Sequence, residues 1–229
     1  MRPDHKILLE VAGHDLRSPL NGILATAQFL LDDAAPSLSE EHIKLLQSIV
    51  SSSQKMFASI DDFLELCALE SGNATLDQKP TDIGALIERN LAMSPLPADR
   101  KELRVDLARG ESLPLIEVDS ARMSRVFGKL LKNMIEGCGS GSNIVVSVRV
   151  ANGNVVISLR AAGANDSSDE SRPIHQELNG KNESIEATTL AFRLSKRILE
   201  RHGGTIRADY SDEGCTYTLM LPTSVAPER

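Results

Sequence analysis

Apolar residues recur at alternating intervals of four and three residues over two long stretches near the start of the chain. The first stretch contains Leu9, Gly13, Leu16, Leu20, Ile23, Ala27 and Leu30, and the second contains Ile43, Leu46, Val50, Ser53, Phe57, Ile60, Leu64 and Cys67. Such a narrow strip is typical of the seam of a coiled coil or four-helix bundle, so two long helices are predicted. A short connection containing Pro36 separates them, and Ser37 with Glu40 is expected to form a capping box at the second helix.

A single hairpin of two such helices would leave each apolar strip half covered. Two hairpins packed as a four-helix bundle would cover both strips, so a homodimer through about residues 5–70 is predicted. Ser71-Gly72-Asn73 is expected to end the second helix, and residues 79–82 are expected to form a linker.

From about residue 82 the pattern changes to mixed helix and strand. Ala151-Asn152-Gly153-Asn154 predicts a tight turn between two strands, and residues 162–187, rich in Ser, Asp, Asn, Glu and Gly, predict a flexible loop. The order of elements predicts an α+β sandwich with helices on one face of a mostly antiparallel sheet. Helices are expected at 82–93, 119–136 and 188–201, and strands at 103–107, 144–150, 155–159, 205–209 and 216–221.

Composition and charge exclude several classes of function. The chain has 25 Lys and Arg against 32 Asp and Glu, a net charge of −7, and only 3% aromatic residues, so nucleic-acid binding is not expected. No apolar run approaches the ~20 residues of a membrane span, and no signal peptide is recognisable, so no membrane contact is expected within this chain. Cys67, Cys138 and Cys215 form no CxxC pair, which predicts reduced thiols in a cytoplasmic protein.

The segment from Gly13 to Asn21 reads Gly-His-Asp-Leu-Arg-Ser-Pro-Leu-Asn and carries the main candidate chemistry. His14 follows a seam position, so its ring should lie on the flank of the bundle, where a partner can reach it. A carboxylate from Asp15 bonded to one imidazole nitrogen would fix the tautomer and make the other nitrogen a better nucleophile. Pro19 is expected to bend the helix one turn further on. An isolated His-Asp pair would be interpreted as an ordinary surface pair.

This segment resembles the H-box of sensor histidine kinases, which lies on the first helix of a dimeric phosphoacceptor hairpin. The resemblance covers essentially the whole chain. It implies an antiparallel helical hairpin forming a dimeric four-helix bundle over residues 1–75, followed by an α/β sandwich of the histidine-kinase ATPase type over residues 80–229. Further matching landmarks are Leu69-Glu70-Ser71-Gly72, Asp119 and Arg122 ahead of Asn133, His202-Gly203-Gly204-Thr205-Ile206, and the segment from Gly214 to Pro222.

Carried over residue by residue, the resemblance makes His14 the phosphoacceptor and Asp15 the adjacent acid or base. Arg17 matches the next position of the box, and Ser18 stands where many relatives hold a Thr or Asn that orients water for dephosphorylation. The phosphoryl partner would be an Asp on a response-regulator receiver domain. Its expected docking positions, besides second-helix residues near 51–55, are Asn21, Thr26 and Gln28.

The expected nucleotide site departs from the family pattern. The N-box usually carries two Asn one turn apart, but Lys129 replaces the first, and Asn133 alone remains as the magnesium-coordinating position. Glu136 stands where a Lys is common. Arg160 follows the strand that should lead into Asp-x-Gly-x-Gly, and an Arg side chain has only donors to offer the adenine amino group.

The second glycine box is also altered. Residues 187–192 read Ala-Thr-Thr-Leu-Ala-Phe in place of Gly-x-Gly-Leu-Gly-Leu, and these side chains block the close approach of backbone amides to phosphates. Phe192 is expected to turn into the core. Asp166 or Asp169 could take the place of the missing Asp, but neither is flanked by the glycines of the family motif. Binding of Mg-ATP is therefore expected to be impaired.

Three functions stay open at this point. The favoured one is a phosphotransferase that passes phosphate through His14, because the H-box is intact while the glycine loops are not. The others are an autokinase that uses Mg-ATP through Asn133, and a non-catalytic pseudokinase that regulates a partner kinase or receiver. Because only thirteen residues precede His14, the chain is expected to be either part of a larger kinase or a stand-alone relay protein. His202, before two glycines at a helix end, is interpreted as structural.

Overall fold

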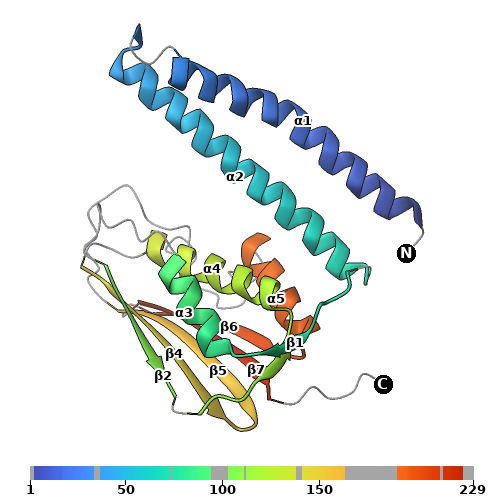
Figure 1. Ribbon diagram of the computed structural model, residues 1–229, viewed down its shortest axis with the longest axis vertical. Coiled ribbons are helices and arrows are strands. Elements are labelled where there is room, and N and C mark those ends of the chain that lie inside the picture. Colours follow the sequence, from blue (N-terminus) through green and yellow to red (C-terminus); the bar gives the residue numbers. More distant parts are fainter. Residues whose placement is uncertain are drawn as a thin grey trace. The chain divides into compact units, whose positions relative to one another are not determined.

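The computed structural model describes residues 3–33, 37–72, 74–93, 103–110, 112–137, 141–162, 190–211 and 214–223. The chain divides into two compact units, residues 1–74 and residues 75–229, each of which is described by itself. The first unit contains two long helices, and the second combines a five-stranded sheet with three helices (Figure 1).

The first unit is a hairpin of α1 (Pro3–Asp33) and α2 (Glu40–Glu70), which run side by side (Figure 1). The two helices confirm the predicted heptad pattern, since Gly13, Leu20 and Ala27, spaced seven residues apart, are buried. Gly13 allows a close approach, because a Cβ atom there would lie 2.6 Å from a methyl group of Leu64 on α2. Pro19 lies inside α1, which continues through it as one helix.

The predicted capping box at the start of α2 is wrong. Ser39, in an extended conformation, is the N-cap, and its Oγ accepts a hydrogen bond of 3.3 Å from the amide of His42. A capping side chain must reach the third amide of the helix, and because α2 begins at Glu40 this requirement selects Ser39 over Ser37. The other end of α2 is as predicted: Ser71 is the C-cap, and Gly72 has a positive φ of 74°.

The sheet of the second unit has the order β2-β4-β5-β7-β6. β2 runs parallel to β4 and every other neighbouring pair is antiparallel, which confirms a mostly antiparallel sheet. The helices α3, α4 and α5 cover one of its faces, as predicted (Figure 1). The strands are β2 (Arg104–Arg109), β4 (Asn143–Ala151), β5 (Asn154–Ala162), β6 (Thr205–Ser211) and β7 (Gly214–Pro222), and the helices are α3 (Ile83–Met93), α4 (Ser120–Gly137) and α5 (Leu190–Arg201).

The predicted turn between β4 and β5 is confirmed. Asn152 and Gly153 have φ angles of 51° and 73° and pair the two strands through a two-residue loop. Two positive φ angles are those of a type I′ turn, whose twist matches that of the flanking strands.

The predicted linker at 79–82 is wrong in part. Lys79–Thr81 forms β1, which pairs antiparallel with β3, Ile116–Val118. Three-residue strands are too short to show an alternating pattern, and Pro80 argues against a strand. Ala162, the first residue of the predicted loop, belongs to β5, and the rest of the predicted loop lies outside the described residues.

The core of the second unit lies between the sheet and the three helices. Phe192 is buried on α5, as predicted, with its ring centroid 6.4 Å from that of Tyr217 on β7. The apolar face of α4 is buried, namely Met123, Val126, Phe127, Leu130, Leu131 and Met134.

Two glycines of this unit predict opposite effects of the same substitution. A Cβ atom at Gly204 would lie 2.5 Å from the carbonyl oxygen of Met220, whereas one at Gly128, inside α4, would meet nothing within 4 Å. G204A should therefore lower the free energy of unfolding by about 1–3 kcal/mol. G128A should raise it by about 0.5–1 kcal/mol, because Gly is a poor helix former.

Urea unfolding followed by tyrosine fluorescence measures this difference. The chain has no Trp, and its two Tyr, Tyr210 and Tyr217, both belong to the second unit. Equal effects of the two substitutions would contradict the close approach at Gly204.

Candidate functional site

The helix α1 presents His14 on its exposed flank, beside the buried Gly13. The side chain of His14 is 83% exposed and that of its neighbour Asp15 is 72% exposed. The imidazole Nδ1 lies 3.5 Å from Oδ1 of Asp15, which leaves Nε2 directed away from the carboxylate. A carboxylate on the Nδ1 side favours the tautomer in which Nε2 carries a lone pair, and this is the arrangement of an imidazole nucleophile.

One turn beyond His14, Arg17 forms an ion pair across the hairpin with Asp61 of α2. Its Nε donates a hydrogen bond of 3.2 Å to Oδ1 of Asp61, and its Nη2 donates to the same oxygen. The sequence analysis singled out Arg17 but not Asp61. No motif contains Asp61, and its place opposite Arg17 depends on the register of the hairpin.

The proposed docking positions beyond the histidine are exposed. Asn21, Thr26 and Gln28 all face solvent, and the hydroxyl of Thr26 donates a hydrogen bond of 2.8 Å to the carbonyl oxygen of Gly22. Ser18 is exposed as well. On α2 the expected patch at 51–55 needs one correction, because Ser53 is buried in the hairpin at 3% exposure.

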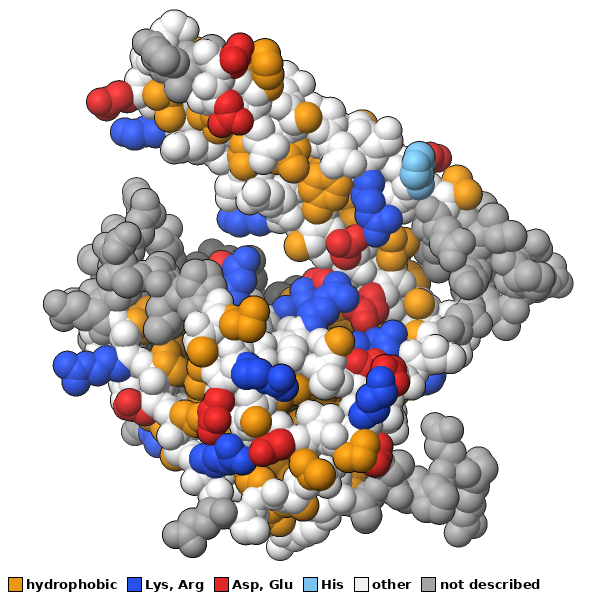
Figure 2. Space-filling view, in the orientation of Figure 1, with side chains coloured by type: hydrophobic (Ala, Val, Ile, Leu, Met, Phe, Trp, Pro, Cys, Tyr) orange, Lys and Arg blue, Asp and Glu red, His pale blue; other side chains and the backbone are white. Residues whose placement is uncertain are grey.

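The hairpin also exposes large apolar side chains, which Figure 2 shows along its surface. Leu16 and Ile23 are 56% and 53% exposed, although they belong to the same heptad repeat as the buried Leu20. In the first predicted strip Gly13, Leu20 and Ala27 are buried while Leu16, Ile23 and Leu30 are exposed, whereas the members of the second predicted strip are buried or half-buried. Large apolar side chains outside the predicted strips are exposed as well, namely Val11 and Phe29 on α1, and Leu45, Ile49, Met56 and Phe63 on α2.

Of the predicted nucleotide site, the structure describes α4, the end of β5 and residues 190–192 at the start of α5. Lys129 and Asn133 lie one turn apart on α4 and are partly exposed. Glu136 lies 3.8 Å from Lys132, so part of its negative charge is balanced within the helix. Arg160 is exposed near the end of β5. The glycine-box positions 163, 164 and 187–189, with Asp166 and Asp169, lie outside the described residues.

The residues around Asn133 do not form a magnesium site by themselves. Mg²⁺ prefers oxygen ligands, usually one or two carboxylates together with substrate phosphates. Asn133 offers one amide oxygen, while Lys129 and Lys132 place two ammonium groups on the same two turns of helix. No cluster of three His, Cys, Asp or Glu suited to a metal occurs among the described residues.

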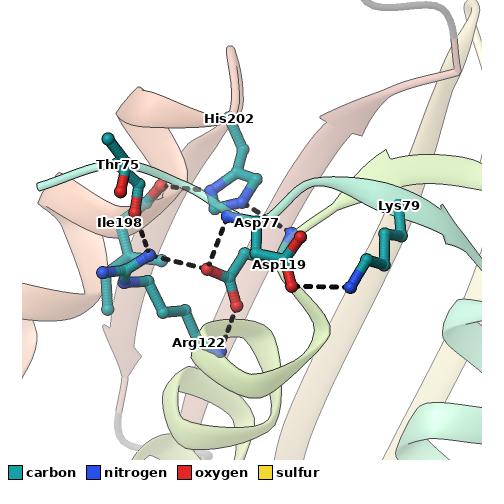
Figure 3. Close-up of polar contacts among 7 residues, drawn as sticks. All are labelled: Thr75, Asp77, Lys79, Asp119, Arg122, Ile198 and His202. Atoms are coloured by element: carbon teal, nitrogen blue, oxygen red, sulfur yellow. Dashed lines mark hydrogen bonds and ion pairs between the residues drawn. The ribbon is translucent and has the colours of Figure 1, made fainter.

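Asp119 forms the centre of a polar cluster in the second unit (Figure 3). Its Oδ1 accepts from the amide of Arg122, which makes it the N-terminal cap of α4. Its Oδ2 accepts from the amide of Asp77 at 3.2 Å and from the guanidinium of Arg122 at 2.6 Å. Arg122 also donates to the carbonyl oxygen of Thr75 at 2.9 Å. Burial alone would raise the pKa of Asp119, but these donors outweigh it and hold the pKa below its usual range.

His202 completes this cluster from the end of α5 and is buried, which confirms its structural interpretation. Its Nε2 accepts a hydrogen bond of 3.0 Å from the amide of Asp119, and its Nδ1 lies 2.7 Å from the carbonyl oxygen of Ile198. The ring must therefore be neutral, with its proton on Nδ1. Burial lowers the pKa of His202, and the positive charges of Arg122 and Arg201 lower it further, against the carbonyl of Ile198 and the carboxylate of Asp119.

Each of the two units matches a known family model. The model described as "His Kinase A (phospho-acceptor) domain" matches residues 5–72. The model described as "Histidine kinase-, DNA gyrase B-, and HSP90-like ATPase" matches residues 118–225. The chain belongs to the two-component histidine kinases. His14 lies within the segment that matches the phosphoacceptor model of this family, and Asn133 within the segment that matches the ATPase model.

Curated histidine kinases resemble the chain over most of its length. It is 27% identical over 213 residues to the sensor histidine kinase ZraS of Escherichia coli, covering 93% of this chain and 44% of ZraS. It is 26% identical over 234 residues to the aerobic respiration control sensor protein ArcB of the same organism, covering 98% of this chain and 30% of ArcB. The chain thus spans less than half the length of these relatives.

Solved histidine kinases share the fold. Full-length ShkA in complex with AMPPNP superposes with a TM-score of 0.70 at 20% identity, covering 97% of this chain and 47% of ShkA. Histidine kinase ThkA in complex with the response regulator protein TrrA superposes with a TM-score of 0.63 at 21% identity, covering 95% of this chain and 61% of that one. Among the described residues, no helix is long and apolar enough to span a membrane.

The buried His202 predicts a loss of stability in acid. Because its pKa in the folded chain is lowered, the unfolded chain binds the proton more readily, so the stabilisation is complete above the ordinary pKa of about 6.5 and is lost as the pH falls below it. The free energy of unfolding of the second unit should therefore fall more steeply from pH 7.5 to pH 5 in the wild type than in H202Q. Urea unfolding at each pH, followed by tyrosine fluorescence, measures both slopes.

The matched control is H42Q, which removes an exposed imidazole from the other unit. It should keep the wild-type slope. A slope in H202Q equal to that of the wild type would show that the imidazole of His202 is not held neutral by this cluster.

Proposed function

We propose that this chain transfers phosphoryl groups through a phosphohistidine at His14, with an Asp of a response-regulator receiver domain as its partner. The observation that carries the proposal is the exposed imidazole of His14 with a carboxylate of Asp15 on its Nδ1 side. In this proposal residues 1–75 are the dimerisation and phosphoacceptor domain, and residues 80–229 are the ATP-binding-like domain. The thiols of Cys67 and Cys215 support a reducing, cytoplasmic setting.

The transfer uses the two nitrogens of His14 differently. The lone pair of Nε2 attacks the phosphorus of the receiver's aspartyl phosphate, and the bond from phosphorus to the carboxylate oxygen breaks as the carboxylate leaves. Asp15 accepts the proton from Nδ1 as the ring becomes positive, so the phosphorylated ring ends neutral. Ser18, exposed one turn beyond His14, is suited to orient a water molecule for hydrolysis of the phosphohistidine.

A receiver domain would dock on α1 beyond His14. The polar side chains of Asn21, Thr26 and Gln28 support this position, since they are exposed about two to four turns beyond His14. The complex of the related kinase ThkA with its response regulator supports the class of partner.

We also propose that the nucleotide site is impaired. The match to the ATPase family model supports a nucleotide site in the second unit, and a nucleotide there would be Mg-ATP. Against its full activity, Lys129 puts a cation where a neutral amide is usual, and Arg160 offers only donors at the adenine position. No step of the transfer above therefore passes through ATP.

A set of purified receiver domains, phosphorylated on their Asp, tests the transfer. The wild-type chain should acquire acid-labile phosphate from its matching receiver, and H14Q should acquire none. D15N should slow the transfer by about 100-fold or more, because it removes the proton acceptor. Incubation with labelled Mg-ATP should give little or no label in any of these variants.

Each alternative function has its own outcome in this experiment. Label from Mg-ATP that vanishes in H14Q would establish an autokinase and overturn the impaired site. No label from either donor, with receiver binding retained, would favour a pseudokinase that regulates its partner without catalysis.

We further propose that the hairpin forms a homodimer through its exposed apolar strip. Leu20 is buried within the hairpin, so a substitution there would disturb the packing of one chain and not only its dimer contact. Leu16 and Ile23 are exposed at heptad spacing. A second copy of the same strip would cover them in a four-helix bundle.

I23K should shift the chain towards monomer in analytical ultracentrifugation, because it puts a charge into the proposed interface. The control A25K adds the same charge at an exposed position two residues away and should leave the dimer intact. If I23K sediments like the wild type, the interface lies elsewhere.

A further inference from the structure

The environment of His14 contains a cation that is already engaged. Arg17 follows His14 by three residues on α1, so the two side chains are neighbours on the helix surface. Arg17 is also the only Lys or Arg between residues 7 and 33. On α2 the nearest cation to the level of Asp61 is Lys55, about 9 Å away along the helix axis. A charge placed on His14 would therefore meet Arg17 first.

The ion pair that holds Arg17 is weak by its geometry. Both donors of Arg17 converge on one oxygen, Oδ1 of Asp61, so the two groups do not form a two-oxygen fork. The side chains are 39% and 49% exposed. Ion pairs between exposed side chains contribute little to stability, and water competes for both partners.

We infer that Arg17 changes partner when His14 is phosphorylated: Asp61 holds the guanidinium in the unmodified chain, and the phosphoryl group holds it in the modified chain. This inference rests on the proposed phosphohistidine. A phosphoryl group carries close to two negative charges and three acceptor oxygens, so it offers Arg17 a two-oxygen fork that Asp61 does not. Asp61 is thus a positioning residue that acts on the phosphoryl group through Arg17.

The exchange also acts on the hairpin itself. Arg17 and Asp61 tie α1 to α2 one turn from the close approach of Gly13 and Leu64. When Arg17 turns to the phosphoryl group, this tie between the helices is lost and the carboxylate of Asp61 is released to solvent. The charge and the contacts on the flank that a receiver meets therefore differ between the two states of His14.

A phosphoryl exchange with phosphoimidazole tests this without a receiver or a nucleotide. In this reaction the P–N bond of phosphoimidazole breaks, a P–N bond to His14 forms, and the imidazole released takes up the proton that His14 loses. Phosphorus NMR gives the equilibrium constant, and H14Q identifies the signal of His14 among the 5 histidines of the chain. An equilibrium constant does not depend on how fast any partner docks.

D61N should raise this equilibrium constant about two- to fivefold, the size of one exposed ion pair, because Arg17 no longer has to leave a carboxylate. R17Q should lower it. In the R17Q background, D61N should have no effect, since the two substitutions act through one interaction. E41Q removes the same charge about 30 Å away along α2 and should match the wild type.

Two results would overturn the inference. One is an equilibrium constant in D61N equal to that of the wild type, and the other is the same increase from D61N with and without Arg17. Failure of receiver domains to label His14 would instead overturn the proposed function. The equilibrium constants of D61N, R17Q and the double variant with phosphoimidazole could still be measured in that case.

Discussion

The second unit depends on the carboxylate of Asp119. This one buried group caps α4, binds the amide of Asp77 and holds the guanidinium of Arg122, while its own amide fixes the ring of His202 at the end of α5. An unpaired buried charge is costly, so the carboxylate must collect all of these donors at once. Three segments far apart in the sequence, 75–77, 119–122 and 198–202, are thereby brought to one point. The helix α4, which carries Lys129 and Asn133, begins at this cluster.

In the first unit the corresponding constraint is the inward position of Gly13. Because a helix turns by about 100° per residue, a buried residue 13 places residue 14 on the flank, outside the core of the hairpin. The exposure of His14, on which its proposed chemistry depends, thus follows from the burial of Gly13. Asp15 and Arg17 flank the imidazole on neighbouring positions of the helix, and in the proposed transfer Asp15 is the proton acceptor and Arg17 the counter-charge for the product.

The helices, the main sheet and the β4–β5 turn were predictable because each has a signal within its own segment: heptad spacing, apolar alternation, or Asn152-Gly153. Features that depend on pairing across the chain were not. The strands β1 and β3 are recognisable only once they pair, and Asp61 belongs to no motif because the hairpin register brings it to Arg17. Ser37 and Ser39 are both capping residues in the sequence, and the start of α2 decides between them. The resemblance to histidine kinases identified His14, whereas the partner of Arg17 required coordinates.

The contact from Arg122 to the carbonyl oxygen of Thr75 has a consequence for the boundary between the two units. The amide of the preceding residue, Ala74, donates to the carbonyl oxygen of Ala68 in the last turn of α2. Two adjacent residues are therefore tied by hydrogen bonds to different units, Ala74 to the hairpin and Thr75 to α4. The hydrogen bonds of the first unit therefore extend as far as Ala74, and those of the second unit begin at Thr75, the next residue of the chain.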